Sequence, residues 1–306
     1  MTKETTKTLE PNTIVTASDN NYTWGIFLLV ASIMRAKMPE KILIGAASWS
    51  PEWLKHIGNL PNVEILEMSH DKRCPTTHKP HIMLEAKTDR VTWVDADGIF
   101  SGNCSKQLVG EKDCIYSRTY TPNEMIARYK KGPRPLDIWL KDNDDMKQAR
   151  TQPDVCAAII GVSLSKSKEF LKYWEQQMKK VLPTKVTDPI LKGSPYRHTD
   201  EDVLNSVLTC WSNAPKITQQ YQLNIPGIPH FIHFPLSPKP WQGAWTSYNL
   251  KFYDELTGLV TWCRENNLLP DFEEVPASLE PNHKLRYQMI APFLRPYKKI
   301  KSILKS

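Results

Sequence analysis

Glycine is scarce in this chain, and several other common signals of function are missing. The 306 residues hold 12 glycines against 24 prolines, which argues against glycine-rich phosphate loops, collagen repeats and flexible linkers. The longest apolar run, residues 26–34, is far shorter than the roughly 20 residues of a membrane-spanning helix. The polar first residues, MTKETTKTLEPN, contain no apolar stretch, so we expect no secretory signal.

The cysteines and the charges exclude further classes of protein. Six cysteines are scattered without the pairing of a zinc site or a CxxC redox motif, so we expect reduced cysteines in a cytoplasmic protein. Seven of the 40 basic residues and none of the 33 acidic ones lie between Pro281 and Ser306. The net charge of +7 therefore belongs to the tail, because the first 280 residues carry 33 charges of each sign. A neutral body without a recognition motif argues against a nucleic-acid partner.

Strands and helices alternate in the first hundred residues. Apolar and β-branched runs predict strands at 13–18, 41–46, 63–66 and 91–94, and periodic apolar residues predict helices at 22–37 and 51–57. This alternation indicates an α/β fold with a mostly parallel sheet wound by right-handed crossovers. Ligands bind at the carboxyl ends of strands in such sheets, which is where we expect Ser18-Asp19 and Asp95-Ala96-Asp97.

The rest of the chain is less regular. Residues 118–150 mix charges with prolines, and we expect loops and short helices inserted there. An apolar strand follows at 156–164, and Ser165 is predicted to cap a helix over 166–182. A further helix is predicted at 201–211 and a short strand at 231–234, ahead of a proline-rich loop.

The first candidate site is the pair Asp95 and Asp97, which follows the strand sequence VTWV. Two carboxylates one residue apart can both reach one hard divalent cation where the chain leaves a strand and turns. A solvated acidic turn is the alternative interpretation. The apolar strand ahead of the pair weakens that alternative, since ligands collect at strand carboxyl ends.

Two later clusters also have a functional and a structural interpretation. His233 can be a third metal ligand or a strand-end histidine, and Lys239 can neutralise phosphate oxygens or lie in solvent. Asp200 and Glu201 stand at the start of the predicted helix, where carboxylates either cap the helix or face a sugar.

A polar turn follows the first predicted strand. Asp19, Asn21 and Tyr22 have the composition of a turn and helix cap. Their alternative role is to hold a nucleotide base and ribose, with Tyr22 stacked on the ring.

In this order the clusters resemble the motifs of glycosyltransferase family 8, whose members have the GT-A fold. The resemblance covers residues 13–241, and its most specific parts are the DxD and the closing segment. It rests on Ala17-Ser18-Asp19-Asn20-Asn21-Tyr22, Trp93-Val94-Asp95-Ala96-Asp97, Cys156-Ala157-Ala158, Asp200-Glu201-Asp202-Val203-Leu204-Asn205 and the segment from His233 to Trp241. The chain departs from the family where Cys156-Ala157-Ala158 replaces Asn-Ala-Gly and where Leu236 replaces glycine.

The resemblance implies a Rossmann-like GT-A domain over residues 1–280, with a nucleotide-binding part at about 12–112 and an acceptor-side insertion at about 118–150. It implies the transfer of a sugar, with retention, from a UDP-sugar to a saccharide acceptor. It also implies Mn²⁺ or Mg²⁺ bound by Asp95, Asp97 and His233. The donor-binding residues that it implies are Ala17, Ser18, Asp19, Asn21, Tyr22, Lys79, Asp95 and Lys239.

Glu201 stands where the family has a glutamine. Our hypothesis is that Glu201, with Asp200 beside it, lies near the anomeric carbon of the donor sugar. There a carboxylate can act as a nucleophile or stabilise an oxocarbenium-like state.

Two other classes of protein stay open. Asp95-Ala96-Asp97-Gly98 resembles the nucleophile motif of haloacid dehalogenase-like phosphatases, although that motif normally follows the first strand of a chain. A non-catalytic glycan-binding protein is the second alternative, because the ten tryptophans could line a sugar groove.

The basic tail at 281–306 has an amphipathic pattern. Its apolar residues lie three or four apart, with lysines between them: Phe293, Leu294, Tyr297, Ile300, Ile303 and Leu304. This pattern predicts a helix that either adsorbs to an anionic membrane surface or packs on the protein itself. We expect an enzyme at the inner face of the plasma membrane that acts on a saccharide or lipid-linked saccharide in surface polysaccharide or lipopolysaccharide synthesis.

Overall fold

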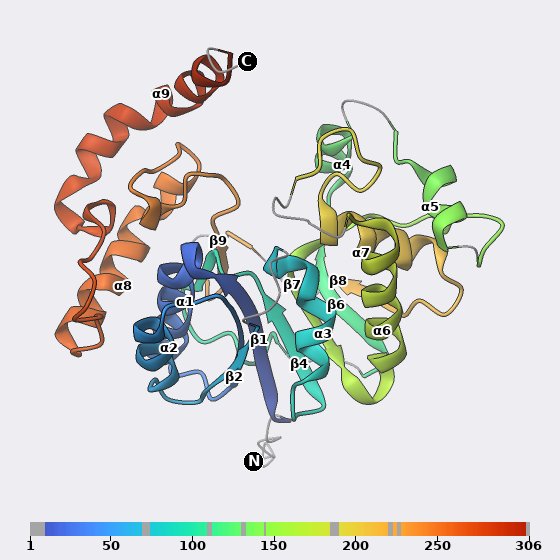
Figure 1. Cartoon of the computed structure of the whole chain (residues 1–306), viewed down its shortest axis with the longest axis horizontal. Coiled ribbons are helices and arrows are strands. Elements are labelled where there is room, and N and C mark those ends of the chain that lie inside the picture. The colour runs from blue at the N-terminus through green and yellow to red at the C-terminus, as the bar shows by residue number, and fades with distance from the viewer. Residues whose placement is uncertain are drawn as a thin grey trace, which may run out of the picture. The chain divides into compact units, whose positions relative to one another are not determined.

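The computed structural model describes residues 10–68, 74–108, 112–129, 133–143, 145–183, 190–219, 223–224 and 228–303, with side chains as far as residue 293 (Figure 1). The chain divides into two compact units. The first unit comprises residues 1–21, 39–95 and 104–222, and the second comprises residues 22–38, 96–103 and 223–306. The chain thus enters the second unit at Tyr22 and again at Ala96, inside two of the candidate site segments.

The first unit contains a seven-stranded sheet in the order β3-β2-β1-β4-β7-β6-β8. Its strands are β1 (Asn12–Asp19), β2 (Lys41–Ala47), β3 (Val63–Glu67), β4 (Arg90–Val94), β6 (Cys114–Thr119), β7 (Val155–Ser163) and β8 (Lys216–Gln219). All neighbours pair in parallel except those of β7, which runs antiparallel to β4 and β6. The predicted α/β class with a mostly parallel sheet is therefore confirmed.

Helices of the first unit pack against this sheet and against one another. They are α2 (Pro51–Gly58), α3 (Lys79–Leu84), α4 (Pro122–Arg128), α5 (Leu136–Asn143), α6 (Leu164–Val181) and α7 (Thr199–Cys210). Large apolar side chains such as Trp93, Trp139 and Trp174 fill the core between them and are fully buried. The short helices α4 and α5 lie where the sequence predicted an insertion of loops and short helices.

The prediction that Ser165 caps the helix after β7 is wrong. The helix begins at Leu164, two residues earlier than predicted, and a carboxylate from another segment takes the role of the cap. Asp89 accepts hydrogen bonds from the Ser165 amide at 2.7 Å and from the Ser163 hydroxyl at 2.8 Å. Sequence reasoning considers the serines because they are local, whereas Asp89 reaches the helix end only through tertiary structure.

The second unit is built from helices around a two-stranded antiparallel sheet. Its main elements are α1 (Thr23–Arg35), β5 (Gly98–Phe100), β9 (Phe231–His233), α8 (Tyr253–Glu265) and α9 (Lys284–Ile303). Gly98 pairs with His233 and Phe100 with Phe231 across the two strands. Helix α1 packs against β5 and α8, and most of its residues are buried.

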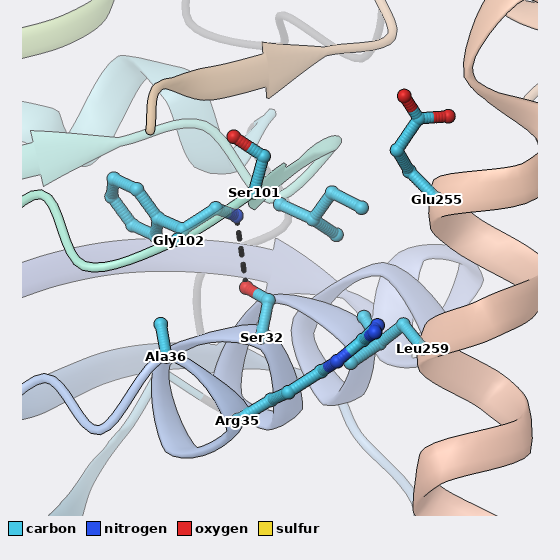
Figure 2. A pocket seen from close by; sticks show the side chains of 9 residues that line it. Ser32, Arg35, Ala36, Ser101, Gly102, Glu255 and Leu259 are labelled. Carbon is cyan, nitrogen blue, oxygen red and sulfur yellow. Dashed lines mark hydrogen bonds between the residues drawn. The ribbon is translucent and has the colours of Figure 1, made fainter. Parts of the chain in front are cut away.

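A hydrogen bond fixes β5 on α1, and a pocket of about 200 Å³ lies beside it (Figure 2). The Ser32 hydroxyl accepts a hydrogen bond from the Phe100 amide at 3.0 Å and donates one to the Leu29 carbonyl at 2.6 Å. Figure 2 shows this bond on one side of the pocket, with Arg35 and Glu255 extending from α1 and α8. The strand that follows Asp97 is thereby anchored to a buried helix.

The C-terminal tail forms the predicted helix, α9, and its two faces differ. Tyr287 and Ala291 are buried, and the Tyr287 ring lies 6.4 Å from that of Tyr253. On the opposite face, Leu285, Met289 and Phe293 are 72%, 64% and 68% exposed. The predicted apolar residues Leu294, Tyr297, Ile300, Ile303 and Leu304 lie outside the described side chains. Among the described helices, none is long and apolar enough to cross a bilayer.

Candidate active site

Two polar segments leave the sheet at the same edge. Strands β1 and β4 are parallel neighbours, with Val15 opposite Trp93, and they end at Asp19 and Val94. The Asp95 amide continues the ladder by one residue, because it donates to the Ala158 carbonyl on β7 at 2.9 Å. The predicted position of both clusters at the carboxyl ends of parallel strands is therefore confirmed.

A buried lysine links Asp95 to the start of α7. The Lys79 side chain is 1% exposed, and its ammonium group lies 2.8 Å from both the Asp95 and the Asp200 carboxylates. The same group donates to the Ala157 carbonyl at 2.9 Å. Burial lowers the pKa of Lys79, but the two carboxylates outweigh burial and hold it well above the ordinary value. All three N–H groups therefore have partners within the protein.

Asp95 is also held by the strand that leads to it. Its Oδ1 accepts a hydrogen bond from the Trp93 indole at 2.8 Å, in addition to the Lys79 contact. The Lys79 ammonium lies 5.2 Å from the centre of the Trp93 ring. The orientation of the carboxylate is thus set by an indole and an ammonium group that are themselves buried.

In the second unit, Asp97 lies between a histidine and a lysine. Its Oδ1 is 3.1 Å from His233 Nε2, and its Oδ2 is 2.6 Å from Lys239 Nζ. The Lys239 ammonium also donates to the Phe234 carbonyl at 2.6 Å and lies 6.0 Å from the centre of the Tyr22 ring. Burial raises the pKa of Asp97, but the charges of His233 and Lys239 outweigh it and keep the pKa well below its ordinary range.

The β5–β9 pairing places His233 beside the start of β5 because residue 98 is a glycine. A Cβ at Gly98 would lie 2.1 Å from the end of the Phe231 ring, so a larger residue there would displace that ring. The Phe231 ring stacks on the His233 imidazole at 6.2 Å, and the His233 amide donates to Asn224 at 2.9 Å. These contacts fix the histidine that faces Asp97.

Asp95, Asp97 and His233 form a group that could hold a metal ion. Asp97 and His233 are brought together by strand pairing, and only Ala96 separates Asp95 from Asp97 in the chain. Two carboxylates and an imidazole are a suitable donor set for Mn²⁺, and Mg²⁺ accepts the same oxygens. The side chains are 20%, 15% and 14% exposed, so the group is neither sealed from ligands nor open to bulk solvent.

The carboxylates at the start of α7 have three different roles. Asp202 accepts the His198 amide at 2.8 Å and so stabilises the helix end, as the capping interpretation predicts. Asp200 binds Lys79, and burial raises the pKa of Asp200 despite that contact. Glu201 accepts hydrogen bonds from the Ala157 amide at 2.9 Å and from the Tyr120 hydroxyl at 3.1 Å, and it pairs with Arg128.

The turn after β1 is held together by its own side chains. The Asp19 carboxylate accepts hydrogen bonds from the Asn21 backbone amide at 3.0 Å and from the Asn21 side-chain amide at 3.3 Å. The Trp49 indole N–H donates hydrogen bonds to the Ser18 carbonyl at 2.9 Å and to the Ser18 hydroxyl at 3.1 Å. Ala17 is buried in the sheet. In the second unit, the Tyr22 ring meets the Trp241 ring edge-on at 6.0 Å.

Comparison with known proteins depends on structure, since no family model and no curated protein matches the chain. The bifunctional glycosyltransferase WbbM, in its apo form, matches with a TM-score of 0.56 at 17% identity over 84% of this chain. This chain spans about half, 51%, of the length of WbbM. The galactosyltransferase LgtC, in complex with donor and acceptor sugar analogues, matches with a TM-score of 0.52 at 13% identity over 75% of this chain and 89% of LgtC. An active-site mutant of LgtC, with glutamate in place of glutamine, matches with a TM-score of 0.54 at 13% identity over 81% of this chain and 95% of the mutant chain.

The chain has the GT-A fold of these glycosyltransferases. In this chain Asp95 and Asp97 follow β4, which is the fourth strand in chain order. The haloacid dehalogenase-like alternative places its motif after the first strand, so the observed order gives it no support.

Sequence reasoning missed the side chains that surround the candidate carboxylates of this glycosyltransferase fold. Tyr120 and Arg128 lie in the irregular segment after β6 and contact Glu201 from there. The sequence around Tyr120 and Arg128 contains no pattern that predicts their contact with Glu201. The one available signal was the concentration of arginine and tyrosine in a segment without helical periodicity.

Proposed function

We propose that the protein is a metal-dependent glycosyltransferase that transfers a sugar from a nucleotide-sugar, a UDP-sugar, to a saccharide acceptor. The observation that carries this proposal is the arrangement of Asp97 between His233 and Lys239, two residues after Asp95 at the end of a sheet strand. Carboxylate and imidazole ligands next to a lysine match the needs of a diphosphate leaving group, which carries negative charge and oxygen atoms. The GT-A fold supports the same proposal.

Asp95, Asp97 and His233 would hold the Mn²⁺ or Mg²⁺ ion, which supplies positive charge for the diphosphate when bound. His233 would bind through a neutral imidazole nitrogen, so metal binding competes with its pairing to Asp97. Lys239 would add a point charge to the diphosphate. Two of its three N–H groups have partners among the described residues, Asp97 and Phe234. This leaves one donor for a phosphate oxygen.

In the proposed reaction the bond between the anomeric carbon and the diphosphate oxygen breaks, and its electron pair leaves with the nucleotide. A new bond forms from the acceptor hydroxyl oxygen to the anomeric carbon, and the hydroxyl proton passes to the departing phosphate oxygen. We place Glu201, with Asp200 beside it, near that carbon, and we propose retention of configuration. Three hydrogen-bond donors hold the Glu201 carboxylate. We therefore favour a role in which Glu201 is a fixed negative charge that stabilises the oxocarbenium-like state, instead of a role as the nucleophile.

Lys79 is proposed to serve the donor site indirectly. Its ammonium group has protein partners at all three N–H positions, so it orients Asp95 and Asp200. Ser18 accepts a hydrogen bond from Trp49, and Asp19 accepts one from Asn21. We propose that Asn21 and Tyr22, which follow Asp19, contact the ribose and the base.

Nucleotide release with Mn²⁺ tests the proposal. A panel of UDP-sugars, each with and without Mn²⁺, should contain one donor that the wild-type protein hydrolyses slowly and transfers when an acceptor is present. Asp97→Asn should reduce that release at least about 100-fold, because it weakens the metal group. An exposed aspartate on α8, changed as Asp254→Asn, is the matched control and should keep full release. Metal-independent release, or full activity in Asp97→Asn, would refute the proposed function.

We further propose that the exposed face of α9 docks on an anionic membrane, at the cytoplasmic side, where lipid-linked acceptors of surface polysaccharide or lipopolysaccharide synthesis are available. Leu285, Met289 and Phe293 lie on one face, and the tail holds seven basic residues and no acidic one. The triple serine variant of these three residues should lose binding to phosphatidylglycerol vesicles and keep activity on a soluble acceptor. Ile138→Ser, at an exposed isoleucine of α5, is the control. Equal sedimentation of wild type and triple variant would contradict docking.

A further inference from the structure

The segment after β6 delivers two side chains to the candidate carboxylate Glu201. Tyr120 follows directly after β6, and Arg128 is the last residue of α4. Helix α4 is fixed locally by a capping box, in which Thr121 and Glu124 exchange hydrogen bonds at the helix start. The positions of Tyr120 and Arg128 are therefore set by a short, well-defined element.

Three donors surround the Glu201 carboxylate: the Tyr120 hydroxyl, the Ala157 amide and the Arg128 guanidinium. The Tyr120 hydroxyl lies 3.1 and 3.2 Å from its two oxygens, and the Ala157 amide of β7 lies 2.9 Å from Oε2. Arg128 pairs with Glu201 and, through its other terminal nitrogen, with Asp202. The guanidinium also lies 5.3 Å from the centre of the Tyr120 ring, so both side chains form one unit around the carboxylate.

The charges around Glu201 keep its carboxylate ionised and the Tyr120 phenol protonated. Burial raises the pKa of Glu201, but Arg128 and the Ala157 amide outweigh burial, so the net shift is downward. Burial and the negative charge of Glu201 raise the pKa of Tyr120 far above its ordinary value. The other titratable or charged groups that face this cluster are Lys79, Arg118, Tyr129, Asp154, Cys156, His198, Asp200 and Asp202.

We propose that Tyr120 is a positioning residue for the transfer reaction, which acts by holding the Glu201 carboxylate in place. The role rests on the proposed function, since it requires Glu201 to face the transferred sugar. In this role a residue of the segment 118–150 contributes to the transfer reaction through Glu201. Tyr120 lies just before α4 and Arg128 ends it, so both side chains reach Glu201 from one segment.

A second tyrosine of the same segment provides a matched control. Tyr129 is half-buried like Tyr120, and its ring lies 5.9 Å from the Arg128 guanidinium. Its hydroxyl donates to Asp154 instead of Glu201. Tyr129→Phe therefore removes a buried tyrosine hydroxyl and leaves the Glu201 contacts in place.

Steady-state release of nucleotide by wild type, Tyr120→Phe, Tyr129→Phe, Glu201→Gln and the double variant Tyr120→Phe/Glu201→Gln tests the proposal. We expect Tyr120→Phe to lower kcat about tenfold with KM for the donor within about twofold, since a hydrogen bond to a charged group is lost. Tyr129→Phe should stay within about twofold of wild type. In the Glu201→Gln background, Tyr120→Phe should have no further effect, because it acts through the carboxylate.

A carboxyl ¹³C NMR titration supplies a readout that does not require activity. Loss of a donor to the charged form should raise the pKa of Glu201 in Tyr120→Phe and leave it unchanged in Tyr129→Phe. Equal kcat losses in both tyrosine variants, an unchanged Glu201 titration in Tyr120→Phe, or the same loss in the Glu201→Gln background would overturn the positioning role. Wild-type activity in Glu201→Gln would overturn it together with the Glu201 part of the proposed function. Absence of release from every donor would refute the proposed function and, with it, the role of Tyr120 in transfer. The titration would still decide separately whether Tyr120 stabilises the Glu201 carboxylate.

Discussion

Gly25 controls the position of the DxD segment, and its replacement by alanine should impair the candidate metal group. The residue lies in the first turn of α1, and a Cβ there would be 2.5 Å from the Ala96 carbonyl oxygen and 2.8 Å from the Trp241 ring. Ala96 lies between the two aspartates. Because eleven of the thirteen residues of α1 are buried, we expect the helix to stay and the Ala96 peptide to move.

The expected displacement follows from the contact distances. Ordinary contact with a Cβ begins near 3.4 Å, so the Ala96 carbonyl has to retreat by about 0.9 Å from its 2.5 Å position. A shift of about 1 Å in a catalytic group costs on the order of 100-fold in rate. Overpacking costs about 1–3 kcal/mol, and the helix propensity of alanine returns up to about 1 kcal/mol, so Gly25→Ala should still fold.

The assay compares Mn²⁺ affinity, nucleotide release and melting temperature in Gly25→Ala and Gly258→Ala. Gly258 is a helical glycine of α8 whose nearest neighbour to a built Cβ is Arg35 Nη1 at 4.0 Å. The control should bind Mn²⁺ and release nucleotide like wild type, whereas Gly25→Ala should lose at least about tenfold in each. Unchanged Mn²⁺ affinity and release in Gly25→Ala would refute the reasoning, whatever its melting temperature.

Three further changes test the electrostatics and capping of the first unit. Lys79→Met leaves the buried Asp200 and the half-buried Asp95 without their cation and should lower the melting temperature by about 10 °C. Lys87→Met, in an exposed ion pair, should change it by less than about 2 °C. The pKa of Glu201 is depressed in the folded state, so its ionised form stabilises the fold above the unfolded pKa near 4.3, and that contribution is lost as pH falls through the folded pKa. Urea unfolding should therefore show Glu201→Gln less stable than wild type at pH 7, with the difference shrinking below about pH 4; a difference independent of pH would contradict the assignment. Asp89→Ala should destabilise the start of α6 by about 1 kcal/mol and Ser165→Ala by less than half of that; the reverse order would restore Ser165 as the cap.

The sequence was most informative where a short segment carries its own signal. Alternating strands and helices predicted the parallel sheet, and strand ends placed Asp19 and Asp95 at one edge, as observed. The expectation that Asp97 and His233 share a metal site, with Lys239 nearby, followed from a family resemblance and not from spacing, because Asp97 and His233 are 136 positions apart in the chain. Strand pairing between β5 and β9 brings them together, and β5 is too short to be recognised from sequence.

The sequence by itself determined the fold class, the DxD at a strand end and the separation of a neutral body from a basic tail. These features depend on hydrophobic periodicity, on strand ends and on composition, all of which are local properties of a chain. Only the tertiary structure decided that Lys79 binds two carboxylates, that Asp89 and not Ser165 supports α6, and that Tyr120 and Arg128 surround Glu201. The physical reason is burial: a charged or hydroxyl group inside the protein needs a partner, and packing selects that partner from anywhere in the chain.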